Sequence, residues 1–145
     1  MTKQQLKEYC DAEFENIDTV LYQIKQVVKP EADYSVADLA AIATFIHNCY
    51  NGFENIIKRI FVYRQRELKN TPTWHKDILK TAADAGIISD DMHATLSNYL
   101  SFRHFFVHSY SFSLRWEELK PLVDGIEVTF SRFKTAAYSF ISTLD

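Results

Sequence analysis

The chain contains few of the residues that make turns. Three glycines and three prolines occur among its 145 residues, roughly a third of the average usage of these two residue types. A β-sandwich or a β-barrel needs a turn about every 8–12 residues, and Gly and Pro build most turns. Because 47% of the residues are hydrophobic, a disordered chain is excluded as well. We therefore expect an all-α protein.

Apolar residues recur every three or four positions along most of the chain, the spacing of one face of an α-helix. Residues that start or end helices interrupt these stripes: Pro30, Ser35, Gly86, Ser89 and Pro121. Together, the stripes and the capping residues predict about five helices. A short helical turn near 114–119 precedes the last one. The predicted helices cover about 3–29, 36–66, 74–85, 90–108 and 121–143.

These helices predict an antiparallel bundle that forms a single domain over residues 1–145. Gly52 inside the second helix costs about 1 kcal/mol relative to Ala, and a close helix crossing would account for it. Cys10 and Cys49 form neither a CxxC pair nor a disulfide framework. With no apolar segment suited to a signal peptide or a membrane span, we expect a cytoplasmic protein without a membrane contact.

Charge is distributed unevenly. The formal net charge is −3, but residues 58–80 contain seven Lys and Arg residues against two acids. A local positive field of this kind can attract a polyanion even when the whole chain is acidic. The alternative is that long amphipathic helices simply expose their charged faces.

An arginine interrupts the apolar stripe of the fourth predicted helix. The stripe runs through Met92, Leu96 and Leu100 to Arg103 and then Val107. At about 100° per residue, Arg103 lies within about 20° of the centre of that face. Because Arg is almost never fully buried without a partner, we expect its side chain to be paired, or to face a cleft or a subunit interface.

Arg103 is followed by His104, His108 and Tyr110. Two histidines four residues apart could reach one metal ion, but the Glu of an H-E-x-x-H motif is missing and no third ligand is evident. We therefore predict neither a metal nor a cofactor. An imidazole can take the proton of a ribose 2′-OH, and an Arg fork can hold the phosphate. This set of groups suits metal-independent cleavage of RNA.

Arg103 and His108 are five residues apart, which is about 140° around a continuous helix. One straight helix does not readily point both side chains at one phosphate. Either the helix ends or distorts near Val107, or two chains place their motifs side by side. The second option favours a symmetric homodimer with a composite cleft on its two-fold axis.

The motif Arg103-(x4)-His108-x-Tyr110 resembles the R-x4-H-x-Y signature of the HEPN superfamily, in particular of the HepT-type toxins. Two further segments resemble the family pattern in the expected order, and the resemblance covers roughly residues 36–144. These segments are His47-Asn48-x-Tyr50-Asn51-x-x-Glu54 and Trp74-His75-x-Asp77-x-Leu79. For His47, Tyr50 and Glu54 we expect core hydrogen bonding, and for His75 a structural contact to the bundle.

The resemblance implies a helical-bundle homodimer that acts as a ribonuclease toxin. It also implies an MntA-type nucleotidyltransferase antitoxin that transfers AMP from ATP to the motif tyrosine and thereby blocks the ribonuclease. Arg103 and His108 would be catalytic, His104 would support them, and Tyr110 would be the AMPylation site. The expected partners are an RNA substrate (mRNA or tRNA), a second copy of the chain and the cognate antitoxin, with no DNA among them.

Two other functions remain open at this point. In the first, the protein is a non-catalytic HEPN subunit of a two-component nucleotidyltransferase, and Arg103 grips a nucleotide phosphate without cleaving anything. In the second, it is a plain dimerisation bundle, which leaves an arginine on an apolar face unexplained.

Overall fold

The structure, a computed structural model, describes residues 1–30, 33–68, 71–109 and 114–145. In this part of the chain the regular secondary structure consists of five α-helices and no strands, which confirms the all-α prediction. The helices are α1 (Lys3–Val27), α2 (Val36–Tyr63), α3 (Trp74–Asp84), α4 (Asp90–Ser109) and α5 (Trp116–Ser142). None of the described helices combines the length and the hydrophobicity that crossing a membrane requires.

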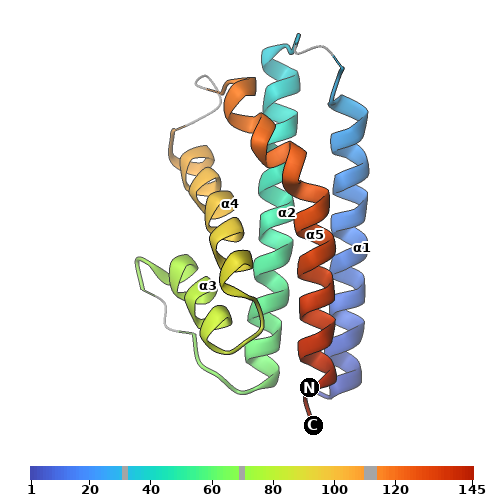
Figure 1. Cartoon of the computed structure of the whole chain (residues 1–145), viewed down its shortest axis with the longest axis vertical. Coiled ribbons are helices and arrows are strands. Elements are labelled where there is room, and N and C mark those ends of the chain that lie inside the picture. The colour runs from blue at the N-terminus through green and yellow to red at the C-terminus, as the bar shows by residue number, and fades with distance from the viewer. Residues whose placement is uncertain (31–32, 69–70, 110–113) are drawn as a thin grey trace.

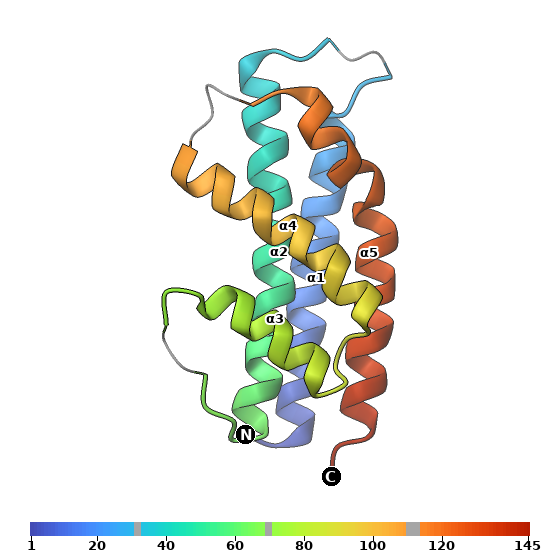
Figure 2. The same cartoon turned by 60° about the vertical axis from the view of Figure 1, so that its left-hand side comes forward.

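Helix α2 is the centre of the bundle. It lies beside the long helices α1 and α5, while α3 and α4 pack on its other side (Figures 1 and 2). All four other helices contact α2, as a predicted spine should. Aromatic rings from three helices meet in the core. The ring centroid of Phe133 of α5 lies 4.8 Å from that of Phe53 of α2 and 6.2 Å from that of Phe14 of α1.

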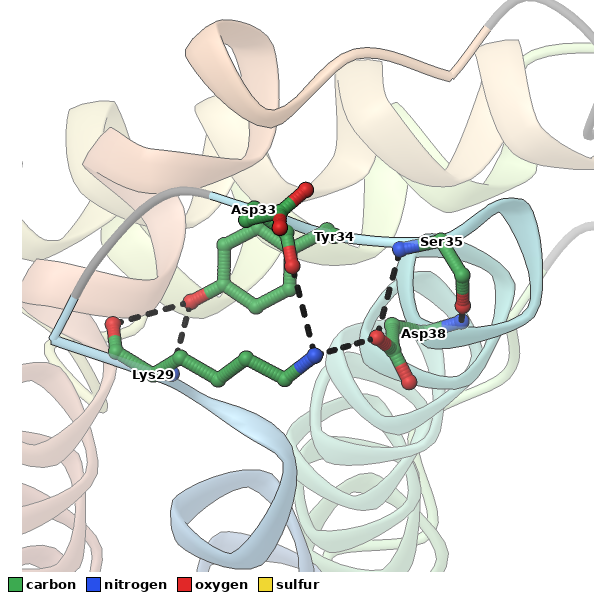
Figure 3. A network of polar contacts seen from close by, with 5 residues as sticks. All are labelled: Lys29, Asp33, Tyr34, Ser35 and Asp38. Atoms are coloured by element: carbon green, nitrogen blue, oxygen red, sulfur yellow. Dashed lines mark hydrogen bonds and ion pairs between the residues drawn. The ribbon is translucent and has the colours of Figure 1, made fainter.

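A polar network fixes the start of α2 (Figure 3). The Ser35 hydroxyl accepts from the Asp38 backbone N–H at 3.1 Å, and the Asp38 carboxylate accepts from the Ser35 backbone N–H at 3.2 Å, which is a capping box. Lys29 donates to the same carboxylate at 2.9 Å and thereby lowers the pKa of Asp38. Tyr34, in this network, also packs against Trp116 at the start of α5. The α1–α2 connection is thus joined to α5.

The last helix begins earlier than predicted. Pro121 was expected to start it, after a separate turn near 114–119, but α5 begins at Trp116 and includes Pro121. Proline lacks an N–H, and its ring crowds the carbonyl of the residue four positions earlier. The first turns of α5 stand at an angle to the rest of the helix (Figure 1). This bend lets the two predicted segments join into one helix.

Helices α1 and α2 approach each other closely at Gly52, as predicted. A Cβ atom on Gly52 would lie 2.7 Å from Cγ1 and 2.8 Å from Cδ1 of Ile17. Ile17 belongs to the buried core, so its side chain has little room to move. A larger residue at this crossing would require the buried Ile17 side chain to shift.

We expect Gly52→Ala to destabilise the protein. The gain in helix propensity is about 1 kcal/mol, and overpacking a core costs about 1–3 kcal/mol, so the net loss should be about 1 kcal/mol in the free energy of unfolding measured by urea denaturation. Gly125→Ala in α5 is the matched control, because its Cβ would meet only the Tyr99 hydroxyl at 3.6 Å, and this variant should be as stable as the wild type or more so. Equal effects of the two substitutions would contradict the close crossing.

Candidate active site on helix α4

The buried apolar face of α4 ends at Arg103. Met92, Leu96 and Leu100 are buried, Arg103 is half-buried, and Val107 is 44% exposed. Val107 was predicted to continue the apolar stripe into the core. It does not, because α4 diverges from α2 towards its C-terminal end (Figure 2). Arg103 therefore lies at the edge of the core, with part of its side chain open to solvent.

The Arg103 side chain is bonded to an amide rather than to an acid. Its Nε donates to Oδ1 of Asn51 on α2 at 3.2 Å. No carboxylate of the described residues forms an ion pair with it. Asn51 was not among the predicted site residues, although its spacing of four residues from His47 and three from Glu54 places it on the same side of α2.

His47 and Tyr50 border Arg103 and carry no charge at neutral pH. Burial, with a further contribution from the Arg103 charge, lowers the pKa of His47. Burial, with a contribution from Glu54, raises the pKa of Tyr50. His47 Nδ1 and the Tyr50 hydroxyl are both buried without a hydrogen-bond partner among the described residues. In the described part of the chain, the expected core hydrogen bonds are therefore not formed by His47 Nδ1 or by the Tyr50 hydroxyl.

Glu54, one turn further along α2, is engaged by α3. Its side chain is almost fully buried, and its two carboxylate oxygens lie 2.8 and 2.9 Å from Nδ1 of His75. Lys58 lies 3.9 Å from the same carboxylate. The structural roles predicted for Glu54 and His75 are confirmed by this contact, which ties α3 to α2.

His104 and His108 lie on another side of α4. Both are exposed, and the centroids of their rings are 4.5 Å apart. Because α4 remains helical through Ser109, it neither ends nor distorts near Val107, and within one chain Arg103 and His108 diverge by about 140°. Tyr110, the predicted AMPylation site, lies outside the described residues.

Several of the described cations of residues 58–80 are held against aromatic rings. Three of them lie against aromatic rings of three different helices: Lys58 over Trp74 of α3, Arg59 over Tyr9 of α1 and Arg64 over Phe140 of α5. Such contacts hold the cations in place individually. Lys58 and Arg59 are half-buried and Arg64 is exposed.

The remaining candidate groups offer no further chemistry. Cys10 and Cys49 are buried free thiols, and burial raises the pKa of each to about 12, so neither is a thiolate at neutral pH. Within the described ranges, no three His, Cys, Asp or Glu side chains come together in a way that could hold a metal ion.

Comparison with known proteins agrees with this architecture. The chain is similar to a solved structure described as a cytosolic protein of unknown function, YutE from Bacillus subtilis, with a TM-score of 0.75 and 12% sequence identity over 94% of this chain and 91% of that one. At this identity the likeness concerns the fold alone. No curated protein matches the chain.

A family comparison covers the site itself. The family model described as HepT-like protein matches residues 41–144, a span that contains Asn51, Arg103, His104 and His108. This match covers more than half of the chain and extends from the first turns of α2 past the end of α5. The chain therefore belongs to the HepT-like family of HEPN proteins.

Proposed function

We propose that the protein is the toxin of a toxin–antitoxin system, a metal-independent endoribonuclease that acts as a homodimer in the cytoplasm and forms one HEPN-like domain. The observation that carries this proposal is the state of Arg103. It lies at the edge of the core, in line with the buried apolar residues of α4, and a neutral amide rather than an acid holds it. A guanidinium kept charged and half-open in this way suits the binding of a phosphate.

The proposed reaction is a transesterification within the RNA. His108 takes the proton of a ribose 2′-OH, and the 2′ oxygen attacks the neighbouring phosphorus. Arg103 binds the phosphate and stabilises the charge that develops on it. The bond from phosphorus to the 5′ oxygen breaks, and the 5′ oxygen takes up a proton, which leaves a cyclic phosphate and a free 5′-OH. His104, next to His108, supports these proton transfers.

A second copy of the chain would complete the site. In a two-fold dimer, Arg103 of one protomer can face His108 of the other, which removes the divergence within one helix. The surface around these residues supports such an arrangement. Phe105 and Phe106 are half-buried and Val107 is exposed, so the end of α4 leaves apolar area that a second copy can cover.

The antitoxin would act through Tyr110. Transfer of AMP from ATP to the Tyr110 oxygen releases pyrophosphate and adds a bulky anion two residues from His108. This adduct fills the cleft and repels the phosphates of RNA. The proposed partners are therefore an mRNA or tRNA substrate and an MntA-type nucleotidyltransferase.

Cleavage of RNA by the purified protein tests the proposed activity. We expect Arg103→Ala and His108→Ala each to lose at least about 100-fold in rate, the scale of a lost acid–base or phosphate-binding group. His93→Ala in α4 and Arg132→Ala in α5 are matched controls and should cleave as the wild type does. Excess EDTA should leave cleavage unchanged. A requirement for a divalent metal, or an active His108→Ala variant, would contradict the mechanism.

Modification of Tyr110 tests the proposed regulation separately. Incubation with the cognate nucleotidyltransferase and ATP should increase the mass by one or more AMP units and abolish cleavage, because the adduct blocks the cleft. Tyr110→Phe should prevent the mass increase, which mass spectrometry of the intact protein detects. The same adduct on the Phe variant would assign the modification to another residue.

The alternative function is a non-catalytic, nucleotide-binding subunit of a nucleotidyltransferase. The observation that favours it is that Arg103 and His108 of one chain lie on different sides of α4, so one chain alone does not bring the proposed base to the phosphate-binding group. Titration of ATP and of RNA against the purified protein distinguishes the two functions. Tight binding of ATP without any RNA product would favour the alternative.

A further inference from the structure

The contact between Arg103 and Asn51 uses only one part of the guanidinium. Arginine has five N–H donors, one on Nε and four on the two terminal nitrogens. Asn51 accepts from Nε at 3.2 Å, so this contact leaves the four terminal donors for another partner. An amide oxygen also differs from a carboxylate, because it orients the guanidinium without cancelling its charge.

The neighbouring groups on α2 add no negative charge. His47 lies one turn and Tyr50 one residue before Asn51. Burial, with the Arg103 charge, lowers the pKa of His47, and burial raises the pKa of Tyr50 further above neutral pH, so neither side chain is negatively charged. Their buried polar atoms also lack partners among the described residues, so they do not form part of a closed network around the guanidinium. The side chains of α2 that lie near Arg103 are therefore polar but carry no negative charge.

Glu54 lies on the same side of α2 as Asn51, and its carboxylate contacts His75 of α3. It lies three residues from Asn51, close enough along the helix to compete for a cation. Both of its oxygens are bonded to His75, and Lys58 lies nearby. Among the described residues this carboxylate pairs with His75 of α3 and Lys58 of α2, and no ion pair joins it to Arg103.

We propose that Asn51 is a positioning residue for Arg103. It fixes the side chain through Nε, leaves the terminal nitrogens for a phosphate of the RNA, and preserves the full positive charge. The Glu54–His75 pair supports this role by occupying the nearby carboxylate. The expected effect on RNA binding rests on the proposed ribonuclease function. The contact between Asn51 and Arg103 can be tested without it.

Two substitutions at Asn51 separate charge from orientation. In Asn51→Asp, a carboxylate of the same shape pairs with Arg103, so we expect weaker binding of RNA, a KM raised at least tenfold, and a salt dependence of binding reduced by about one phosphate contact. In Asn51→Ala, Arg103 keeps its charge but loses its support, so we expect kcat to fall while the salt dependence is retained. Asn48→Asp, which adds the same charge to an exposed position of α2, is the matched control and should behave as the wild type.

RNA binding is measured with the full-length protein and a 2′-O-methyl RNA oligonucleotide. The proposed reaction cannot cleave this oligonucleotide, because its 2′ oxygen carries no proton. Thermal denaturation checks that each variant is folded; the new ion pair should leave Asn51→Asp at least as stable as the wild type. An Asn51→Asp variant that binds and cleaves RNA like the wild type would overturn the proposal. So would an Asn51→Ala variant whose loss of activity equals its loss of folded protein.

A readout independent of activity is the Nε–H group of Arg103, observed by 15N-resolved NMR. Its exchange with solvent should be slow in the wild type, slow in Asn51→Asp and fast in Asn51→Ala. Fast exchange in the wild type would overturn the proposed positioning. If the wild type cleaves no RNA, the ribonuclease function fails, and the NMR and binding results then decide the role of Asn51 by themselves.

Discussion

A positive charge at the edge of the core is the constraint on which the site depends. Arg103 follows Met92, Leu96 and Leu100 on the buried face of α4, where a charge without compensation would be costly. The structure avoids that cost in two ways. Helix α4 diverges from α2 towards its C-terminal end (Figure 2), Arg103 is only half-buried, and Asn51 accepts from its Nε. The charge is thus tolerated without being neutralised.

The same geometry limits what one chain can do. Because α4 continues as a helix through Ser109, the proposed phosphate-binding group and the proposed base lie on different sides of it. A second α4 related by a two-fold axis would bring the two groups together, and it would cover the apolar end of the helix. The proposed catalysis and the proposed dimer are therefore consequences of one feature, an uninterrupted α4.

Much of this fold could be predicted from the sequence, because apolar periodicity and caps such as Ser35 act locally. The start of α5 could not, since a helix that bends at Pro121 depends on its packing rather than on local preference. Arg103 stood out because it breaks the apolar pattern of α4, and the histidines because they follow it at the spacing of the family motif. Asn51 belongs to a segment that resembles the family pattern, but its contact with Arg103 could not be predicted, because only the path of α4 across α2 brings the two side chains together.

Activity in mixed dimers tests most directly whether two chains share the site. One chain carries Arg103→Ala and the other His108→Ala, with different affinity tags so that the mixed dimer can be purified from coexpressing cells. In the proposed arrangement, the mixed dimer contains one composite site with both groups intact. Its rate of RNA cleavage should be about half that of the wild type, while both homodimers of the variants are inactive. A mixed dimer as inactive as the two variants would contradict a site shared between chains.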